Sequence, residues 1–395
     1  MSLTASDRHE VPSTHSVRTS GGWAQRKVAD LLAEADVRIN GSRPCDMIVH
    51  DERLFRRLIV DGTMGLGDAY VDGWWDCGAI DQFFGRVLTA DVPRRVAVDR
   101  HSMFETITQR VMNFQSVARA RRNGERHYDL GNDLFAAMLD PRMTYTCGYW
   151  RNATTLNEAQ DAKLDLVCRK VDLRRGQRVL DAGCGWGAFS QFAAERYGAS
   201  VIGVTVSGEQ VKLARERCAG LPVEIRLQDY REVRESFDHI VSIGMLEHVG
   251  PKNYRTCMRA MHDRLNDYGL VLLHFFAARR SFPNATDIEA TWMTRRIFPG
   301  LVVPSMKQIG AAIDGLFVME DLHNFGADYD PTLMAWFANF DAAWPSLREK
   351  YGERFYRMWK YYLLSCAGAF RCRKYQLWQI VLSKRGVRGG YESVR

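Results

Sequence analysis

The sequence lacks the long apolar run that a membrane-spanning helix needs, which is about 20 residues. Its opening segment, M-S-L-T-A-S-D-R-H-E-V-P-S-T-H, also lacks the apolar core of a secretion signal. We therefore expect a cytoplasmic protein.

No two of the nine cysteines form a C-x-x-C pair, and their number is odd. A disulfide framework usually has an even number of cysteines, and zinc sites commonly contain pairs at that spacing. We therefore expect reduced thiols and no metal site.

The excess of basic charge is small, because 54 Lys and Arg against 47 Asp and Glu give a formal net charge of +7. Such a balance permits contact with an anionic membrane surface or with a nucleic acid, and establishes neither. No recognised nucleic-acid motif accompanies the basic residues, so we predict no nucleic-acid partner.

The length of 395 residues suffices for two domains. Residues 1–20 are polar and rich in Ser and Thr, which predicts a disordered tail. Residues 21–90 predict a small α+β domain, with a helix around Val28, a hairpin over 37–50 and helices over 52–60 and around Phe83.

An arginine-rich segment over 91–126 has helical apolar spacing and predicts a linker helix. Its arginines fit an ordinary solvated face, or a surface that contacts phospholipid head groups.

Residues 127–395 alternate apolar strands with helices, which predicts an α/β domain with a doubly wound, mostly parallel, Rossmann-like sheet. The predicted strands cover residues 178–181, 200–205, 223–227, 239–243, 269–275 and 376–383. Ligand sites in such sheets lie beyond the carboxyl ends of the strands.

The first of these strands forms the start of the segment R-V-L-D-A-G-C-G-W-G, residues 178–187. In this segment Asp181 precedes Gly183, Gly185 and Gly187. Glycines let the backbone turn sharply against a ligand, and the following helix offers its N-terminal amides. The pattern D-x-G-x-G-x-G resembles motif I of class I S-adenosylmethionine methyltransferases, whereas dinucleotide loops have a wider glycine spacing. A turn without a ligand is the alternative.

Polar residues after the next two strands extend the predicted cofactor site. Thr205 stands where an acid often binds ribose hydroxyls, and Gln210 on the next helix, together with Glu209, offers a substitute. Asp229 offers an acceptor for an adenine amino group, and Tyr230 offers a ring to lie against the base. Loop polarity alone is the simpler explanation for this pair.

Two further candidates lie at the ends of later strands. Glu247 follows the fourth strand, at the mouth of the sheet. His274 lies inside the apolar run V-L-L-H-F-F, where a lone histidine is more often a hydrogen-bonded core residue.

Six blocks in order give the chain a specific resemblance. They are H-Y-D-L-G-N-D-L-F, Y-T-C-G-Y-W, L-D-A-G-C-G-W-G, M-L-E-H-V-G-P-K-N-Y, H-N-F-G-A-D-Y-D and C-A-G-A-F-R. Over about residues 23–383 the sequence resembles bacterial cyclopropane-fatty-acyl-phospholipid synthases. This implies transfer of a methylene unit from S-adenosylmethionine to the cis double bond of an unsaturated phospholipid acyl chain.

The resemblance also implies a site. A bicarbonate ion acts as the base, held by Cys147, Glu247, His274 and Tyr329, with the main-chain amide of Phe276 as a further contact. Cys366 is implied as an active-site residue, and Tyr145 and Thr146 complete the predicted cofactor set. Because an ionised carboxylate would repel the anion, we predict that Glu247 is neutral or shares a proton.

The resemblance further implies a homodimer that associates peripherally with the inner face of the membrane. Residues 21–90 are the natural candidate for lipid contact or dimerisation. After the fifth strand, Trp292, Met293, Phe298 and Leu301, with Arg295 and Arg296, would suit an acyl chain beneath a phosphate, or form a helix that covers the sheet.

Two rival functions are retained. One is a methyltransferase of the same fold that acts on a soluble substrate or adds a methyl or methylene branch. The other is a non-catalytic module that binds a lipid surface or a nucleic acid.

Overall fold

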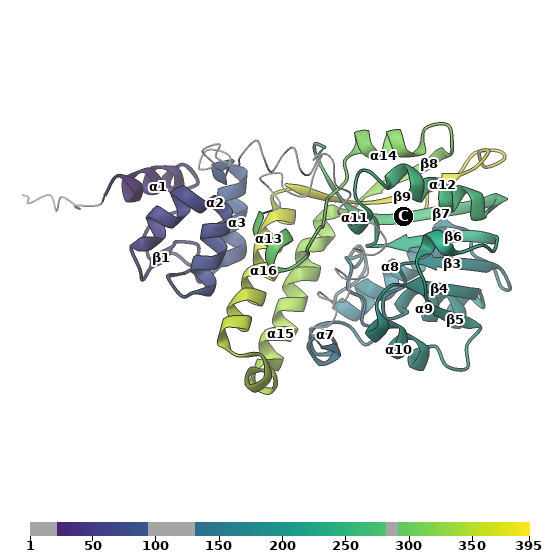
Figure 1. Cartoon of the computed structure of the whole chain (residues 1–395), viewed down its shortest axis with the longest axis horizontal. Helices are drawn as coiled ribbons and strands as arrows, with labels where there is room; N and C mark the ends of the chain where they lie inside the picture. Colours follow the sequence, from purple (N-terminus) through teal and green to yellow (C-terminus); the bar gives the residue numbers. More distant parts are fainter. Residues whose placement is uncertain (1–21, 94–130, 282–290) are drawn as a thin grey trace, which may run out of the picture.

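The computed structural model describes residues 22–93, 131–281 and 291–395 (Figure 1). The predicted tail over 1–20 and the arginine-bearing part of the linker over 91–126 lie outside these ranges. A small helical unit, two long helices and a large sheet follow one another along the molecule.

The central sheet has seven strands in the order β5-β4-β3-β6-β7-β9-β8. Six strands run in one direction, whereas β9 is antiparallel to both of its neighbours, β7 and β8. The strands are β3 (Arg178–Ala182), β4 (Ser200–Thr205), β5 (Val223–Leu227), β6 (Phe237–Ile243), β7 (Leu265–Ala278), β8 (Val318–Asn324) and β9 (Tyr375–Ser383). The predicted α/β fold with a mostly parallel sheet is confirmed.

All six predicted strands are present, but the prediction omitted β8. Its sequence, V-M-E-D-L-H-N, is largely polar, because β8 is an edge strand in which only Asp321 is fully buried, while Met319 and Leu322 pack partly against the core. Such a strand has no apolar run or clean alternation to mark it.

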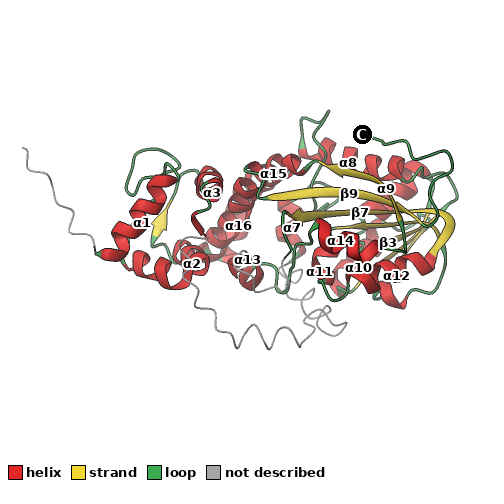
Figure 2. Cartoon of the chain, turned by 90° about the horizontal axis from the view of Figure 1, so that it is seen from above, coloured by secondary structure: helices red, strands yellow, loops and turns green. Residues whose placement is uncertain are grey.

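Helices cover both faces of the sheet, as Figure 2 shows. On one face, α8 (Leu156–Lys170) and α9 (Ala188–Tyr197) pack on Val179, Val201 and Leu272. On the other face, α12 (Tyr254–Arg264) and α14 (Met306–Ile313) pack on Ile240 and Val271. Helices α10 (Gly208–Arg217) and α11 (Leu246–Val249) also contact the sheet, whereas α7 (Asn132–Met138) contacts the long helix that begins at Tyr329 and α13 (Thr291–Arg296) contacts the helix over Arg53–Val71.

The N-terminal unit consists of α1 (Trp23–Glu34), α2 (Arg53–Val71) and α3 (Ile80–Thr89), with two short strands. The predicted hairpin over 37–50 is wrong, because β1 (Ile48–Val49) pairs with β2 (Trp75–Asp76), which lies beyond α2. The buried Asp46 carboxylate accepts bonds from the amides of Arg38 and Arg43, at 2.9 and 3.0 Å, and so closes the 37–47 loop without a strand ladder. Helix α2 also continues past residue 60, across a kink at Gly62.

Two long helices join the N-terminal unit to the sheet. Helix α15 (Tyr329–Tyr351) and helix α16 (Glu353–Arg371) pack against each other, and α16 also contacts α2 and α3. One hydrophobic core includes Phe83 of the N-terminal unit together with Phe340 and Trp359 of these helices. The N-terminal unit is therefore packed firmly onto the rest of the chain.

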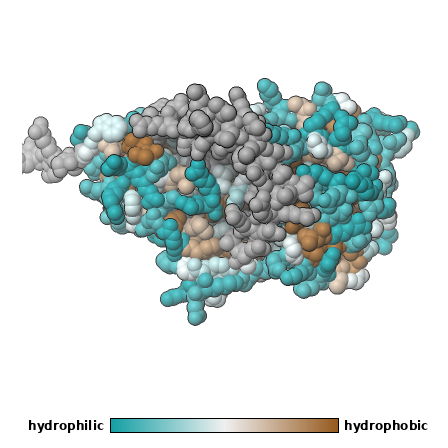
Figure 3. Space-filling view, viewed as in Figure 1, coloured by the Kyte–Doolittle hydropathy of each residue, from teal (hydrophilic) through white to brown (hydrophobic). Residues whose placement is uncertain are grey.

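The face seen in Figure 3 is mainly hydrophilic, with small separate hydrophobic areas. Within the described ranges, no helix is both long and apolar enough to cross a membrane. The same residues contain no group of three His, Cys, Asp or Glu side chains placed to hold a metal ion.

Candidate active site

The glycine turn after β3 has the left-handed backbone that its sequence predicts. Gly183, Gly185 and Gly187 have φ angles of +87°, +55° and +80°, and Gly187 is the N-cap of α9. A Cβ atom at Gly183 would lie 2.9 Å from the Cβ of Met245. Glycine is required at Gly183 for both the backbone angle and the close approach.

A cavity of about 210 Å³ lies beside this turn, at the carboxyl ends of β3 to β6, and we call it the cofactor cavity. Its lining includes nine of the ten predicted cofactor residues. These are Tyr145, Thr146, Asp181, Gly183, Gly185, Thr205, Gln210, Asp229 and Tyr230. The tenth, Gly187, is not in the lining and instead begins α9.

The lining of the cofactor cavity contains two buried groups of opposite charge type. Asp181 accepts a bond of 2.7 Å from the Ser190 hydroxyl, and burial raises the pKa of its carboxyl to about 7. The Lys163 ammonium donates to the Thr146 hydroxyl at 2.9 Å, and burial lowers its pKa to about 8. Both groups are therefore poised to respond to the charge of a ligand.

Sequence reasoning missed Lys163. A signal was present, because Gln160 and Lys163 occupy the same buried face of α8 as Leu164 and Val167. Polar residues on the apolar face of an amphipathic helix indicate a polar partner inside the protein.

Local hydrogen bonds fix three further side chains in the lining of the cofactor cavity. The Thr205 hydroxyl donates to Gln210 Oε1 at 2.9 Å, so this pair occupies the position expected of an acid. Asp229 accepts from the main-chain amide and the guanidinium of Arg231, at 2.6 to 3.0 Å. Glu209 instead forms an exposed ion pair with Lys212 and is not in the lining.

A second cavity of about 40 Å³ adjoins the first, and we call it the small cavity. Its lining includes all four side chains predicted to surround the anion, together with Phe276. Those four are Cys147, Glu247, His274 and Tyr329. The two cavities share five lining residues, which are Tyr145, Thr146, Gly244, His248 and Phe298. Segments far apart in the sequence thus converge beside the cofactor cavity.

Glu247 is completely buried in the wall of the small cavity. Its Oε1 accepts from the Phe276 amide at 2.9 Å, and its Oε2 has no hydrogen-bond partner among the described residues. Burial raises the pKa of this carboxyl to about 7. Contact of the Phe276 amide with an anion stays a prediction, and the anion would have to share that amide with Glu247.

His274 is held in one tautomer by a residue that sequence reasoning missed. The side-chain amide of Gln379 donates to His274 Nδ1 at 3.2 Å, so the ring proton lies on Nε2. Nε2 has no partner among the described residues, and burial lowers the pKa of the ring well below its usual value. His274 is therefore a neutral donor. The signal for Gln379 was a lone polar residue within the apolar strand L-W-Q-I-V-L.

Burial also keeps Cys147 and Tyr329 protonated. It raises the pKa of each group well above its usual value. The Cys147 thiol lies 3.2 Å from the Gly148 carbonyl oxygen and 3.9 Å from the Thr332 hydroxyl. The Tyr329 ring packs against Phe370, with ring centroids 4.5 Å apart.

The structure does not bring Cys366 into this group. Cys366 lies on α16 and lines neither cavity, and burial raises the pKa of its thiol to about 12. A protonated thiol that lies outside both linings has no evident task in catalysis.

The residues predicted for the substrate wall lie in two different places, and their contact with an acyl chain stays a prediction. Phe298 lines both cavities and Leu301 lines the small one, but Trp292 lines neither. Trp292 instead packs against Tyr361 of α16, and the Arg296 guanidinium is bonded to Asp68 of α2. Trp292 and Arg296 lie outside the linings because they bond to the N-terminal unit, a contact that the local sequence does not reveal.

A family model for mycolic acid cyclopropane synthetase matches residues 115–380. This chain belongs to that family. Cyclopropane-fatty-acyl-phospholipid synthase of Escherichia coli strain K12 is 48% identical over 367 residues, which cover 93% of this chain and 94% of that protein. Sphingolipid C9-methyltransferase A of Emericella nidulans is 34% identical over 273 residues, covering 65% of this chain and 52% of that protein.

Among solved structures, mycolic acid cyclopropane synthase CmaA1 in complex with SAH and CTAB matches with a TM-score of 0.63 and 31% identity. The match covers 67% of this chain and 98% of that one. Together with the family and the K12 relative, it identifies the chain as an S-adenosylmethionine-dependent methyltransferase of the cyclopropane fatty acid synthase type.

Proposed function

We propose that this enzyme transfers a methylene unit from S-adenosylmethionine to the cis double bond of an unsaturated phospholipid acyl chain, and that a bicarbonate ion in the small cavity is the base. The observation that carries the proposal is the convergence of Cys147, Glu247, His274 and Tyr329 on that cavity, beside the cofactor cavity.

The donor set fits a small oxyanion. The His274 Nε2–H, the Tyr329 hydroxyl and the Cys147 thiol are neutral donors, and an anion accepts hydrogen bonds from all three types of group. The Glu247 carboxyl, with a pKa of about 7, can hold a proton next to the anion. An ionised Glu247 would repel it.

Bound S-adenosylmethionine supplies an electrophilic methyl group, which the π electrons of the alkene attack while the carbon–sulfur bond breaks toward sulfur. The chain has two tasks in this reaction. The aromatic rings of Tyr145, Phe298 and Tyr329 around the shared wall exclude water and align the alkene. The four polar side chains hold a base where one proton leaves the new methyl group, and the electrons of that C–H bond close the ring.

The location and assembly of the enzyme are part of the same proposal. We expect a cytoplasmic homodimer that associates peripherally with the inner face of the membrane, with residues 21–90 providing lipid contact or the dimer interface and residues 127–395 providing catalysis. Trp23 and Val60 support a contact role for the N-terminal unit, because they are 61% and 71% exposed.

Isotope labelling tests the reaction. Purified enzyme is incubated with vesicles of an unsaturated phosphatidylglycerol and S-adenosylmethionine that carries a trideuterated methyl group. Ring closure removes one deuteron, so the lipid should gain a CD₂ unit. The rate should also fall in bicarbonate-free buffer and recover when bicarbonate is added. An unchanged rate would exclude bicarbonate as the base.

A second candidate is addition of a methyl branch, which the resemblance to the sphingolipid C9-methyltransferase favours. A branch formed by loss of a proton from elsewhere in the chain retains all three deuterium atoms. Mass spectrometry of the lipid product therefore separates the two reactions.

A further inference from the structure

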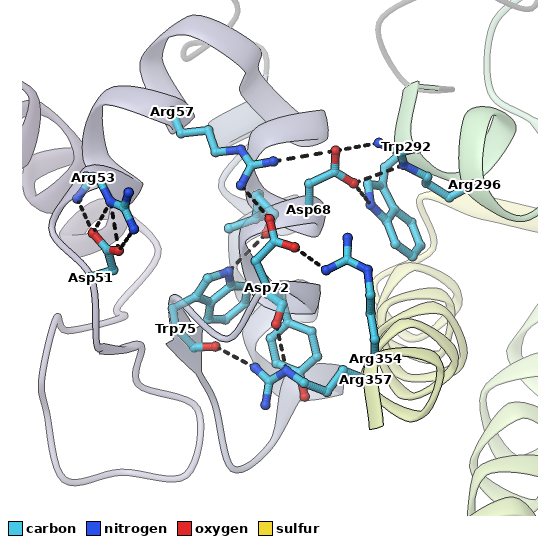
Figure 4. Close-up of polar contacts among 12 residues, drawn as sticks. Asp51, Arg53, Arg57, Asp68, Asp72, Trp75, Trp292, Arg296, Arg354 and Arg357 are labelled. Carbon is cyan, nitrogen blue, oxygen red and sulfur yellow. Dashed lines mark hydrogen bonds and ion pairs between the residues drawn. The ribbon is translucent and has the colours of Figure 1, made fainter. Parts of the chain in front are cut away.

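Asp68 of the N-terminal unit is bonded to a helix that leads into the active site (Figure 4). Its Oδ1 accepts from Trp292 Nε1 at 3.1 Å and from Arg296 Nε at 3.0 Å, and its Oδ2 accepts from Arg296 Nη2 at 2.8 Å. Two parallel bonds between a carboxylate and a guanidinium fix geometry as well as adding energy. Asp68 therefore holds both ends of α13.

The indole of Trp292 is fixed on its other sides as well. Its ring lies against Gly67, where a Cβ atom would be 2.4 Å from the indole, and against Tyr361, with ring centroids 4.6 Å apart. Trp292 is 4% exposed. The glycine before Asp68 thus makes room for the ring whose N–H group Asp68 binds.

The chain after α13 forms a wall that is common to both cavities. The Phe298 amide donates to the Met293 carbonyl of α13 at 2.7 Å, and the Val302 amide donates to the Glu247 carbonyl at 2.9 Å. Between these anchors, Phe298 lines both cavities and Leu301 lines the small one. A shift of α13 would therefore move this 298–301 wall.

We propose that Asp68 is a positioning residue for the methyl-transfer reaction, which fixes α13 and thereby the 298–301 wall. The N-terminal unit then contributes to catalysis through a defined carboxylate, separately from any role in binding lipid. This inference applies to any acceptor that reacts between the two cavities, so it does not depend on ring closure or on bicarbonate.

The test compares Asp68→Asn with Asp72→Asn in the full-length enzyme. Asp72 is the C-cap of α2, one turn after Asp68, and bonds to Arg57 and Arg354, not to α13. We expect Asp68→Asn to lower kcat at least tenfold and to weaken SAH binding severalfold, because the wall borders the cofactor cavity. KM for lipid vesicles should stay near the wild-type value, and Asp72→Asn should retain wild-type kcat and SAH affinity.

Trp292→Phe provides a second variant, which keeps an aromatic ring and removes one bond to Asp68. It should also lower kcat, by a smaller factor.

Wild-type kcat and SAH affinity in folded Asp68→Asn would overturn the proposal. So would equal losses in Asp68→Asn and Asp72→Asn with equal falls in melting temperature, because these would reflect interface stability alone. Turnover is measured as total label transferred to lipid, so a methyl-branched product leaves this test valid and contradicts only the proposed ring closure.

Discussion

At the scale of single residues, the small cavity combines groups whose ordinary ionisation is suppressed. Burial disfavours the charged forms of both Glu247 and His274, so His274 is neutral near pH 7 and Glu247, with a pKa of about 7, still holds a proton in part of the molecules. Each presents a polar atom with no partner among the described residues. An unpaired buried polar group costs free energy, and a bound ligand can recover it. The arrangement favours a polar ligand over an empty apolar pocket.

Glu247→Gln should lower turnover about 100-fold, since the side chain can no longer exchange a proton with the base. SAH affinity should stay near the wild-type value, because Glu247 lines the small cavity and not the cofactor cavity. Calorimetric titration with SAH and a turnover assay separate these effects. Equal losses of both would assign Glu247 to the cofactor site.

The pKa of Glu247 also predicts a pH-dependent stability. Folding raises this pKa from 4.5 to about 7, so the group stabilises the folded protein fully below pH 4.5, and that contribution is lost as the pH rises through 7. The shift corresponds to roughly 3 kcal/mol. Melting temperatures measured without ligands should therefore fall more steeply from pH 5 to pH 8 in the wild type than in Glu247→Gln. Parallel curves would contradict a raised pKa.

Gln379→Leu should lower kcat about tenfold, because His274 loses the donor that keeps its ring proton on Nε2. Gln376→Leu, on the same strand, is the matched control. Gln376 bonds to Asn324 and Trp378 and lines neither cavity. Turnover at saturating substrate measures the effect, and similar values for the two variants would remove the positioning role of Gln379.

At the scale of elements, the turn from β3 to α9 combines three left-handed glycines with a buried acid. The parallel strands on both sides of β3 end at the same edge, so Asp181, Thr205 and Gly244 meet there. This is why the cofactor cavity could be predicted from residues after separate strands.

Gly183→Ala should weaken SAH binding by at least tenfold. The backbone here has a φ angle of +87°, which alanine disfavours, and the new Cβ atom would lie 2.9 Å from the Cβ of Met245. Gly176→Ala is the matched control, since Gly176 has a φ angle of +82° and no atom within 4 Å of the added Cβ. Alanine at position 176 therefore has a similarly unfavourable φ angle, but this position does not line the cofactor cavity. Equal changes in SAH affinity would show that backbone strain alone is responsible.

At the scale of the whole molecule, α16 joins the N-terminal unit to the catalytic part. The C-A-G-A-F segment lies on this helix, and its glycine, Gly368, lies so close to α3 that an added Cβ would be 2.4 Å from the Asp81 carbonyl oxygen. The Arg357 guanidinium adds bonds to the carbonyls of Tyr70 and Trp75, at 2.7 and 3.0 Å. In the structure, this segment serves packing between the two parts.

Gly368→Val should therefore destabilise the protein by about 1–3 kcal/mol through overpacking and should reduce activity as the N-terminal unit is displaced. Cys366→Ala, two residues away on the same helix, should keep turnover near the wild-type value, because this thiol lines neither cavity. Thermal unfolding and turnover of both variants check this. Loss of turnover in a stable Cys366→Ala variant would restore a catalytic role for that thiol.

The sequence by itself determined six of the seven sheet strands, the glycine turn and the set of polar residues that meet at the carboxyl ends of the strands. These follow from local periodicity, from glycine geometry and from motif resemblance, and each of these can be recognised within a short segment of the sequence. The structure alone decided that β1 pairs with β2, that Trp292 packs on α2, and that Lys163 and Gln379 support the two cavities. Those contacts join residues distant in sequence, so they depend on how the elements pack together. A polar residue on the apolar face of α8 or within β9 indicates a buried polar partner, but the local sequence does not identify that partner.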